Sequence, residues 1–514
     1  MEYVIAYDLG TTGNKATLFR IDGKLIASSF YPYDTFYPVV NWVEQDPQQW
    51  WISIEQTTAK LLSETKVDPE RIKCVSFSGQ MMGVVPVDED GNVLRRAIIW
   101  ADQRSVEQAE KLNQHVGNEK VYRITGSRIT PTYFGPKIAW LKENEPDIYR
   151  RSHKFLFAKD FIVYRLTGIY GTDFSDASMS NIFDINNRCW SEELVEALDL
   201  DLEKLPQVTE STAIVGTIKR KVAEELGLSP KTLVIRGAGD GPSATLGAGV
   251  FDSTAAYLYL GSSSWISTCS NKPFFDPLAR TFNFFYPLPG LFCPTGTMQA
   301  GGASYQWIKN TVCEPEIKAA NELNLDVYAI LDDVLDNTQP GAKGLIFLPY
   351  LLGERSPRWN VNARGAFIGL SVVHNKADML RAVLEGVTMN LKIILDIFEN
   401  VGGFRFDKIR LIGGGAKGRN WRQIIADIFG KVVTVPENPA EATSVGAAIT
   451  GAIGAGLITV DEARDFIKDV IIVEPRNSYR EVYDKLYDLF EKSYQALVSV
   501  FDELATLQRN WREG

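Results

Sequence analysis

Short apolar runs separated by polar turns dominate the first eighty residues. One longer amphipathic segment predicts a helix from residue 47 to about residue 64, with Asp46 as its cap and a proline in its first turn. Strands that alternate with such a helix indicate an α/β layered domain. The pattern predicts strands at 3–8, 16–21, 25–31 and 72–77.

The opening pattern recurs near residue 255. An apolar run at 255–260 predicts a strand, a small Gly/Ser turn follows at 261–264, and a second strand begins at Trp265. Two strand–turn–strand units predict two similar halves that face one ligand, and two unrelated hairpins are the alternative. Further strands are predicted at 344–348, 409–412 and 431–435, and helices at 376–399, 420–429 and 479–507.

The composition narrows the class of protein. A chain of 514 residues is long enough for two large domains, and its net charge of −10 argues against nucleic acid as the main partner. An anionic ligand would therefore need a local positive site. The five cysteines are scattered and lack metal-ligand spacing, so free thiols in a reducing cytosol, and a cytoplasmic location, are expected.

Two segments bear on membranes. The N-terminus has no basic region and no cleavage site, so no signal peptide is expected. The longest uncharged run, 444–460, is short for a membrane span and rich in Gly and Ala. It predicts a closely packed helix of a soluble protein, and no membrane partner is expected.

The first turn, Gly10-Thr11-Thr12-Gly13, offers a place for a phosphate chain. Small residues let phosphates lie against backbone N–H groups, and the two threonine hydroxyls can add hydrogen bonds. Lys15 adds positive charge, and Asp8 lies where a carboxylate can hold a hydrated Mg²⁺. An ordinary tight hairpin with Asp capping its turn is the alternative.

A second candidate is Asp240. The strand at 233–235 ends in glycines, and Asp240 then precedes a Gly/Ala helix. A carboxylate displayed at a strand end suits a general base that takes a proton from a substrate hydroxyl. The alternative is a helix N-cap Asp, which is common.

Residues typical of a carbohydrate site follow two other strands. Trp, Asp, Arg and Gln near one another suit a sugar, because polar groups bind vicinal hydroxyls while an aromatic face packs on the C–H side. The alternative is a surface Asp–Arg pair beside a core Trp. The candidate sugar-binding residues are Gln80, Met81, Met82, Trp100, Asp102 and Arg104.

The segment Gly413–Gly418 contains a literal G-x-G-x-x-G between a strand and a helix, with Glu437 about 20 residues on. This matches a dinucleotide fingerprint, so an NAD-dependent oxidoreductase is a rival interpretation. A glycine-lined slot for a flat adenine is the alternative. A dinucleotide fold usually begins with its fingerprint, and this one comes after 400 residues. Position therefore favours the adenine slot.

Together these segments resemble the FGGY family of carbohydrate kinases, most closely its xylulokinases, over nearly the whole chain. The order of all the motifs, and the pattern at 365–386, are more specific than any single loop. The matching segments are Asp8–Gly13, Gly79–Met81, Ala97–Arg104, Pro136–Leu141, Gly239–Asp240, Gly365–Gly386, Gly413–Lys417 and Ala426–Gly430.

The resemblance implies a fold of two actin-like (ribonuclease H-like) α/β domains, 1–250 and 251–514, with ATP and sugar in the interdomain cleft. It implies that Asp240 is the catalytic base and that Asp8 helps to hold Mg²⁺. The residues implied to contact the phosphates and border the adenosine are Thr11, Thr12, Lys15, Ser262, Ser263, Gly414, Gly415 and Asn420. The candidate sugar residues named above would lie in or near the sugar pocket, although Asp102 and Arg104 are also placed to orient Trp100 alone.

The chain departs from typical xylulokinases at two positions. They usually have His where this chain has Met82, and Asn where it has Gly241. Loss of two hydrogen-bonding side chains would cost discrimination of about 1–3 kcal/mol each if nothing replaces them. The expected activity is phosphorylation of a small sugar such as xylulose, with another ketose or a polyol as alternatives.

Two expectations remain. An actin- or Hsp70-like ATPase switch that needs no sugar is the remote rival, because those proteins share the first hairpin. For assembly, a homodimer is the expected alternative to a monomer.

Overall fold

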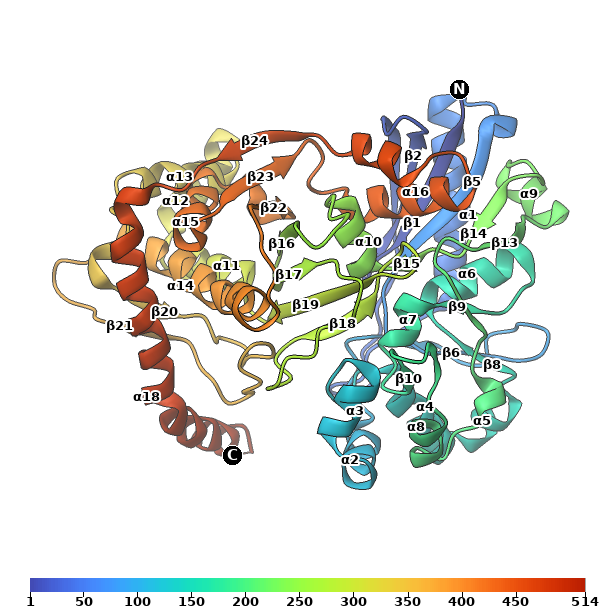
Figure 1. Cartoon of the computed structure of the whole chain (residues 1–514), viewed down its shortest axis with the longest axis horizontal. Coiled ribbons are helices and arrows are strands. Elements are labelled where there is room, and N and C mark those ends of the chain that lie inside the picture. Colours follow the sequence, from blue (N-terminus) through green and yellow to red (C-terminus); the bar gives the residue numbers. More distant parts are fainter. Residues whose placement is uncertain (514) are drawn as a thin grey trace.

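The computed structural model describes residues 1–513, with side chains through residue 508. Two seven-stranded sheets form the centres of two halves (Figure 1). The first sheet has the order β13-β14-β5-β1-β2-β3, with β15 beside the end of β5. Its strands are β1 (Tyr3–Leu9), β2 (Gly13–Arg20), β3 (Leu25–Pro32), β5 (Ile72–Gly79), β13 (Ile214–Thr217), β14 (Leu233–Ile235) and β15 (Ala238–Gly239).

The second sheet repeats this topology in the order β18-β19-β17-β16-β22-β23-β24. In each half an antiparallel hairpin, β1–β2 or β16–β17, is followed by a strand parallel to its first member, β5 or β22. The prediction of two similar halves is therefore confirmed. The strands are β16 (Ala256–Leu260), β17 (Ser264–Thr268), β18 (Phe282–Phe285), β19 (Phe292–Met298), β22 (Lys408–Ile412), β23 (Val432–Pro436) and β24 (Asp469–Val473).

Between β5 and β13 the chain forms a helix-rich lobe beside the first sheet (Figure 1). This lobe includes the short strand β7 (Ala97–Ile98), whose following loop carries Trp100. The helices of the first half are α1 (Pro47–Thr65), α2 (Val106–His115), α3 (Asn118–Thr125), α4 (Phe134–Asn144), α5 (Pro146–Arg151), α6 (Ala158–Thr167), α7 (Phe174–Ser178), α8 (Glu192–Ala197), α9 (Arg220–Leu226) and α10 (Asp240–Gly247).

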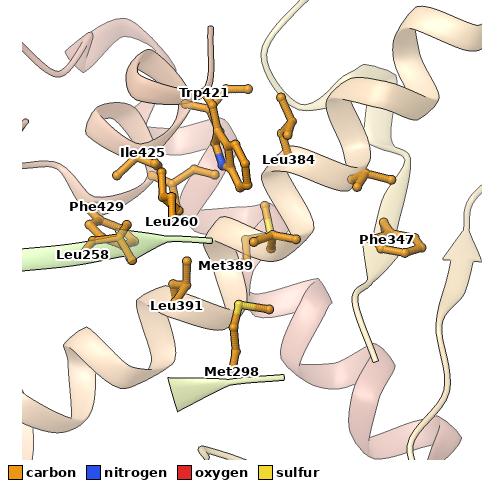
Figure 2. Packing of buried hydrophobic residues seen from close by; sticks show 14 of the residues in the cluster. Leu258, Leu260, Met298, Phe347, Leu384, Met389, Leu391, Trp421, Ile425 and Phe429 are labelled. Carbon is orange, nitrogen blue, oxygen red and sulfur yellow. The ribbon is translucent and has the colours of Figure 1, made fainter. Parts of the chain in front are cut away.

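The core of the second half lies between its sheet and the helices α14 and α15. Figure 2 shows Leu258 and Leu260 of β16 facing Leu391 of α14 and Ile425 of α15. Trp421 is buried there, and its indole N–H donates to Thr388 Oγ1 at 3.2 Å. The helices of this half are α11 (Gly302–Val312), α12 (Glu314–Leu323), α13 (Val327–Asp336), α14 (Lys376–Asp396), α15 (Arg419–Phe429), α16 (Ala442–Gly454), α17 (Val460–Ala463) and α18 (Arg480–Glu513), and the short strands β20 (Ile346–Leu348) and β21 (Ala366–Ile368) pair beside them.

Two helices are exchanged between the halves. Helix α16, from the second half, packs on β1 and β5 of the first sheet. Helix α10, from the first half, packs on α16, and its Thr245 Oγ1 lies 3.4 Å from Ser267 Oγ of β17. The two helices touch backbone to backbone, because a Cβ added at Gly446 would lie 1.9 Å from the Ser243 carbonyl oxygen.

Two predicted helices end differently in the structure. Helix α14 stops at Asp396 and continues as a π-helical turn to Val401, short of an α-helix to residue 399. The uncharged run 444–460 does not form one helix. Helix α16 ends at Gly454, Gly456 takes a left-handed φ of 68°, and Thr459 begins α17 with a capping box. The predicted helix 479–507 is confirmed as α18, which packs on α14 and α15.

None of the helices within residues 1–513 has both the length and the apolar character needed to cross a bilayer.

Candidate active site

The carboxyl ends of β1, β5 and β15 meet at one edge of the first sheet. Asp8 of β1 pairs in register with Ser78 of β5, and Ser78 also pairs with Ala238 of β15. Because parallel strands deliver their ends to the same edge, Asp8 and Asp240, which follows β15, lie on one surface of the sheet. The structure therefore brings the two acidic residues of the sequence prediction together.

Asp240 is the first residue of α10, with Gly239 as the N-cap, so Asp240 is not itself the cap. Its Oδ1 accepts a hydrogen bond from the Gly241 N–H at 2.7 Å. The residue reaches solvent, yet surrounding protein displaces much of its hydration. That desolvation, with a further contribution from the Asp8 carboxylate, raises the pKa of Asp240 to about 7. Such a pKa suits a group that exchanges protons near neutrality.

Asp8 is half-buried beside Asp240. Burial raises the pKa of Asp8, while Ser78, Lys15 and Thr443 act in the opposite direction. The Asp8 and Asp240 carboxylates repel each other, so a cation between them would stabilise both. Among residues 1–508 no group of three or more His, Cys, Asp or Glu forms a metal cluster.

The first turn, Gly10-Thr11-Thr12-Gly13, follows Asp8 closely along the chain. Gly10 N donates to the Gly13 carbonyl at 3.1 Å, which closes the turn. Thr12 is exposed, whereas Thr11 is half-buried and its Oγ1 accepts from the Trp100 indole N–H at 2.9 Å. The first turn and the loop that carries Trp100 are thus joined by a direct hydrogen bond.

The Lys15 side chain already forms an ion pair. Its ammonium lies 3.1 Å from Glu441 Oε1, at the residue that precedes α16. The pair links the first hairpin to a helix from the second half. An incoming phosphate would compete with Glu441 for Lys15.

Two backbone carbonyls of the second turn, Gly261–Ser264, accept hydrogen bonds from the start of α11. Gly302 N donates to the Gly261 carbonyl at 2.7 Å, and Ala303 N donates to the Ser262 carbonyl at 3.0 Å. Ser262 itself is exposed and Ser263 is half-buried, so both remain accessible.

Tyr259 shows that the two halves meet at this point. It belongs to β16, just before the second turn, and stacks on Trp265 with ring centroids 3.9 Å apart. Burial raises the pKa of its hydroxyl, and so do Asp240 and Asp8. Asp8 and Asp240 therefore lie near a strand of the second sheet.

The glycine segment adjoins the same strand. Gly413 has a φ of 86°, and a Cβ there would lie 2.7 Å from the Leu260 carbonyl oxygen, so only glycine fits. Gly414 is exposed, and a Cβ built on it would meet nothing within 4 Å. Asn420 is half-buried and turned toward α13, where its Nδ2 donates to the Asp332 carbonyl at 2.8 Å and to Asp336.

Gln80 and Met81 follow β5 and line the same edge. Gln80 Nε2 donates to Gln45 Oε1 at 2.8 Å, but Gln80 Oε1 is buried and has no partner among the described residues. A buried acceptor left open in this way suits a ligand hydroxyl. The Met81 sulfur packs against Gly239, where an added Cβ would lie 2.4 Å from it. Met82 has a left-handed φ of 65°.

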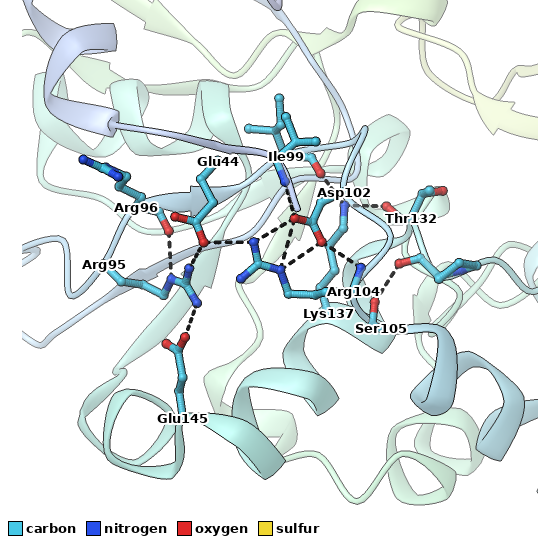
Figure 3. A network of polar contacts seen from close by, with 12 residues as sticks. Glu44, Arg95, Arg96, Ile99, Asp102, Arg104, Ser105, Thr132, Lys137 and Glu145 are labelled. Carbon is cyan, nitrogen blue, oxygen red and sulfur yellow. Dashed lines mark hydrogen bonds and ion pairs between the residues drawn. The ribbon is translucent and has the colours of Figure 1, made fainter. Parts of the chain in front are cut away.

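Asp102 and Arg104, which follow Trp100 in the chain, form a buried ion pair with each other. Figure 3 shows this pair. Both side chains are 0% exposed, and Arg104 also pairs with Glu44 at 2.9 Å. Asp102 accepts from the Val43 and Arg104 backbone N–H groups. The pair therefore shapes the loop that presents Trp100, which is itself 39% exposed. This matches the alternative in which the two residues orient Trp100.

Four residues at the site were not singled out from the sequence: Gln45, Lys137, Tyr259 and Glu441. Their roles depend on contacts between segments far apart in the chain, such as Lys15 with Glu441. A signal existed for only one of them, because Lys137 lies inside a segment that carried the family resemblance.

Family models match both halves. The N-terminal domain model of the FGGY family of carbohydrate kinases matches residues 3–247, and the C-terminal domain model matches residues 256–455. The chain is 32% identical to a gluconokinase of Bacillus subtilis over 99% of this chain and 98% of the relative. It is 31% identical to a xylulose kinase of the same organism over 99% of this chain and 100% of the relative.

Solved structures agree. The crystal structure of xylulose kinase from Rhodospirillum rubrum superposes with a TM-score of 0.90 at 28% identity, covering 98% of this chain and 100% of the other. The gluconate kinase from Lactobacillus acidophilus gives 0.89 at 28% identity, with 98% and 99% covered. The chain belongs to the FGGY family of carbohydrate kinases. The prediction of two actin-like domains is confirmed, and the oxidoreductase interpretation of Gly413–Gly418 is dropped.

Proposed function

We propose that the protein transfers the γ-phosphate of ATP to a hydroxyl of a small uncharged sugar, a ketopentose such as xylulose. One arrangement carries the proposal: Asp240, with its raised pKa, lies beside Asp8 and faces the hairpin of the other half through Tyr259. A base, two small turns and a partly exposed glycine segment follow the ends of β15, β1, β16 and β22, respectively.

In the proposed reaction Asp240 accepts the proton of the sugar hydroxyl as that oxygen attacks the γ-phosphorus. The bond from the γ-phosphorus to the bridging oxygen breaks, and ADP leaves with the electron pair. The first turn offers N–H groups and the hydroxyl of Thr12, and the second turn offers Ser262 and Ser263. These donors would stabilise the charge that develops on the phosphoryl oxygens.

Asp8 is the proposed magnesium ligand. Bound Mg²⁺ would offset charge on the phosphates. Asp8 itself is held half-buried at a strand end, where its backbone is fixed by pairing with Ser78. On the adenosine side, Gly414 and Gly415 would border the base, while Asn420 would fix the start of α15 against α13.

Charge on the sugar side supports an uncharged acceptor. The Arg104 guanidinium is neutralised by Asp102 and Glu44, and the Lys137 ammonium is taken up by backbone carbonyls. Both cations already have partners, although the buried Arg104 Nη1 has none among the described residues. A neutral ketose or polyol therefore fits better than gluconate. Gluconate is the second candidate, because a gluconokinase is as similar in sequence as a xylulose kinase.

An acceptor panel tests this proposal. We expect ADP release with a pentulose, at a kcat/KM at least tenfold above that with gluconate, because an unpaired buried carboxylate costs more than 1.4 kcal/mol. The panel comprises pentuloses, hexuloses, polyols and gluconate in a coupled ADP-release assay. Preference for gluconate would contradict the assignment of an uncharged acceptor, and ATP hydrolysis independent of any acceptor would contradict sugar kinase activity.

The pH dependence of catalysis follows from Asp240. A general base must be deprotonated, so kcat/KM is expected to rise with pH through about 7 and to fall about tenfold per pH unit below that value. The measurement is a profile of kcat/KM from pH 5.5 to 9. A flat profile across this range would be inconsistent with Asp240 as the base.

A further inference from the structure

Lys137 is a fully buried cation, and no carboxylate among the described residues forms an ion pair with it. It lies on α4, its exposed fraction is 0%, and its ammonium donates to three backbone carbonyls. These belong to Met82 at 3.1 Å, Ile99 at 2.8 Å and Thr132 at 2.6 Å. An ammonium has three donors and no acceptor, so these carbonyls satisfy it completely.

The three carbonyls come from three separate loops. Met82 lies in the loop after β5, Ile99 in the loop after β7, and Thr132 in the loop before α4. Each loop also carries a side chain on the sugar side: Met82 itself, Trp100 next to Ile99, and Tyr133 next to Thr132. Tyr133 shares an apolar cluster with Met81 and Met82. Figure 3 shows Lys137 reaching Ile99 and Thr132 beside the Asp102–Arg104 pair.

Two opposing effects act on the buried Lys137 ammonium. Burial lowers the pKa of Lys137 to about 7, Asp102 partly offsets that effect, and Arg104 adds to it. An apolar side chain of similar length would avoid the desolvation cost of a charge, but it would deprive three backbone carbonyls of this donor. What a methionine would lose is the common attachment of the three loops. Met82, with its left-handed φ, is held partly by this contact.

We propose that Lys137 is a positioning residue for sugar binding, whose ammonium holds the loops of Met82, Trp100 and Tyr133 in one arrangement. It touches no substrate itself. Because loop placement within about 1 Å governs how well a bound substrate is oriented, loss of the ammonium acts on the sugar side and on the Trp100–Thr11 hydrogen bond, while the adenosine side, on the other half, is unchanged. This inference rests on the proposed sugar kinase function.

The main variant is Lys137→Met. We expect KM for the best acceptor of the panel to rise roughly 10- to 100-fold, while KM for MgATP stays within about twofold. Lys137→Gln keeps two donors and is expected to give an intermediate rise. Lys142→Met is the matched control, since Lys142 is on the same helix but bonds Asp199 at the surface.

A second readout does not require a substrate. Amide hydrogen exchange at 82–83, 99–101 and 132–133 is expected to be faster in Lys137→Met than in the wild type, with exchange at 413–418, on the other half, unchanged. If the wild type phosphorylated no sugar, the proposed function would fail while this exchange pattern still tested the role of Lys137.

A third variant covers the case in which Lys137→Met does not fold. Gly83→Ala keeps the ammonium but places a methyl group 3.3 Å from the Ile98 carbonyl oxygen, which pushes two of the loops apart. We expect a smaller rise of the sugar KM in the same direction. Folded Lys137 variants with wild-type sugar KM and wild-type exchange would overturn the proposal, and so would equal increases in both KM values.

Discussion

Replacement of Asp240 by Asn is expected to lower kcat for sugar phosphorylation by about 10²- to 10⁴-fold, the range that a positioned general base contributes. Asn has the same shape, and its oxygen can still accept from the Gly241 N–H, as Asp240 Oδ1 does at 2.7 Å. Only the ability to accept the sugar proton is lost. The measurement is kcat in the coupled ADP-release assay.

Nucleotide binding should survive the same replacement. Removing a negative charge near the phosphates lowers repulsion, so the affinity for ATP is expected to equal or exceed that of the wild type. Titration calorimetry with a non-hydrolysable ATP analogue measures it. Asp252→Asn is the control, because Asp252 follows α10 at the surface and pairs with Arg464. Near-normal turnover by the Asp240 variant would refute the base assignment.

Replacement of Gly446 by Ala is expected to have the largest effect on stability, a loss of about 3 kcal/mol or more in the free energy of unfolding. The added methyl group would lie 1.9 Å from the Ser243 carbonyl oxygen, and backbone cannot move aside as a flexible side chain can. Gly247→Ala, where the nearest oxygen is that of Ala442 at 1.8 Å, tests the same contact from the other helix. Denaturant unfolding of both variants gives the change.

A matched control exists for this contact. Gly216 on β13 has only ordinary contact for a new methyl group, with Ile169 Cδ1 at 3.7 Å, so Gly216→Ala should change stability little. Because α10 begins with Asp240, a surviving Gly247→Ala protein should also lose activity. If Gly446→Ala and Gly247→Ala both unfolded with the wild-type free energy, α10 and α16 would be able to move apart without loss of stability.

The local sequence pattern was enough to predict the turns and the strand end that carry the proposed phosphate-binding and catalytic residues. The hairpins around Thr11 and Ser262 and the strand end before Asp240 are each determined by a few neighbouring residues. Small turn residues and alternating apolar positions specify such units without help from distant parts of the chain. The α-helix around Gln423 was predicted for the same reason, from its apolar spacing.

Longer-range features escaped prediction because their causes are not local. Strands β18, β19 and β24 and helices α11–α13 were not predicted, although local signals existed for α13, in its Asp326 cap, and for β24, in its β-branched run. The end of α16 was misplaced because a left-handed Gly456 interrupts an uncharged run that hydropathy alone treats as continuous. The alternative of a surface Asp–Arg pair beside a core Trp was wrong in its placement, because the Asp102–Arg104 pair is buried and Trp100 is exposed. The link of this pair to Glu44 required coordinates, as did the three carbonyls around Lys137. The boundary at residue 250 and the ligand roles of the site residues stay predictions.

Because α10 and α16 each pack against the opposite half, a cut near residue 250 cannot give two fragments that are each complete. A fragment that stops after residue 250 would keep the first sheet but lack α16, which covers β1 and β5. The remaining fragment would lack α10 against its own strands. Each piece would therefore expose apolar surface that the intact chain buries. Recombination between two such enzymes should succeed only when both helices come from the same parent.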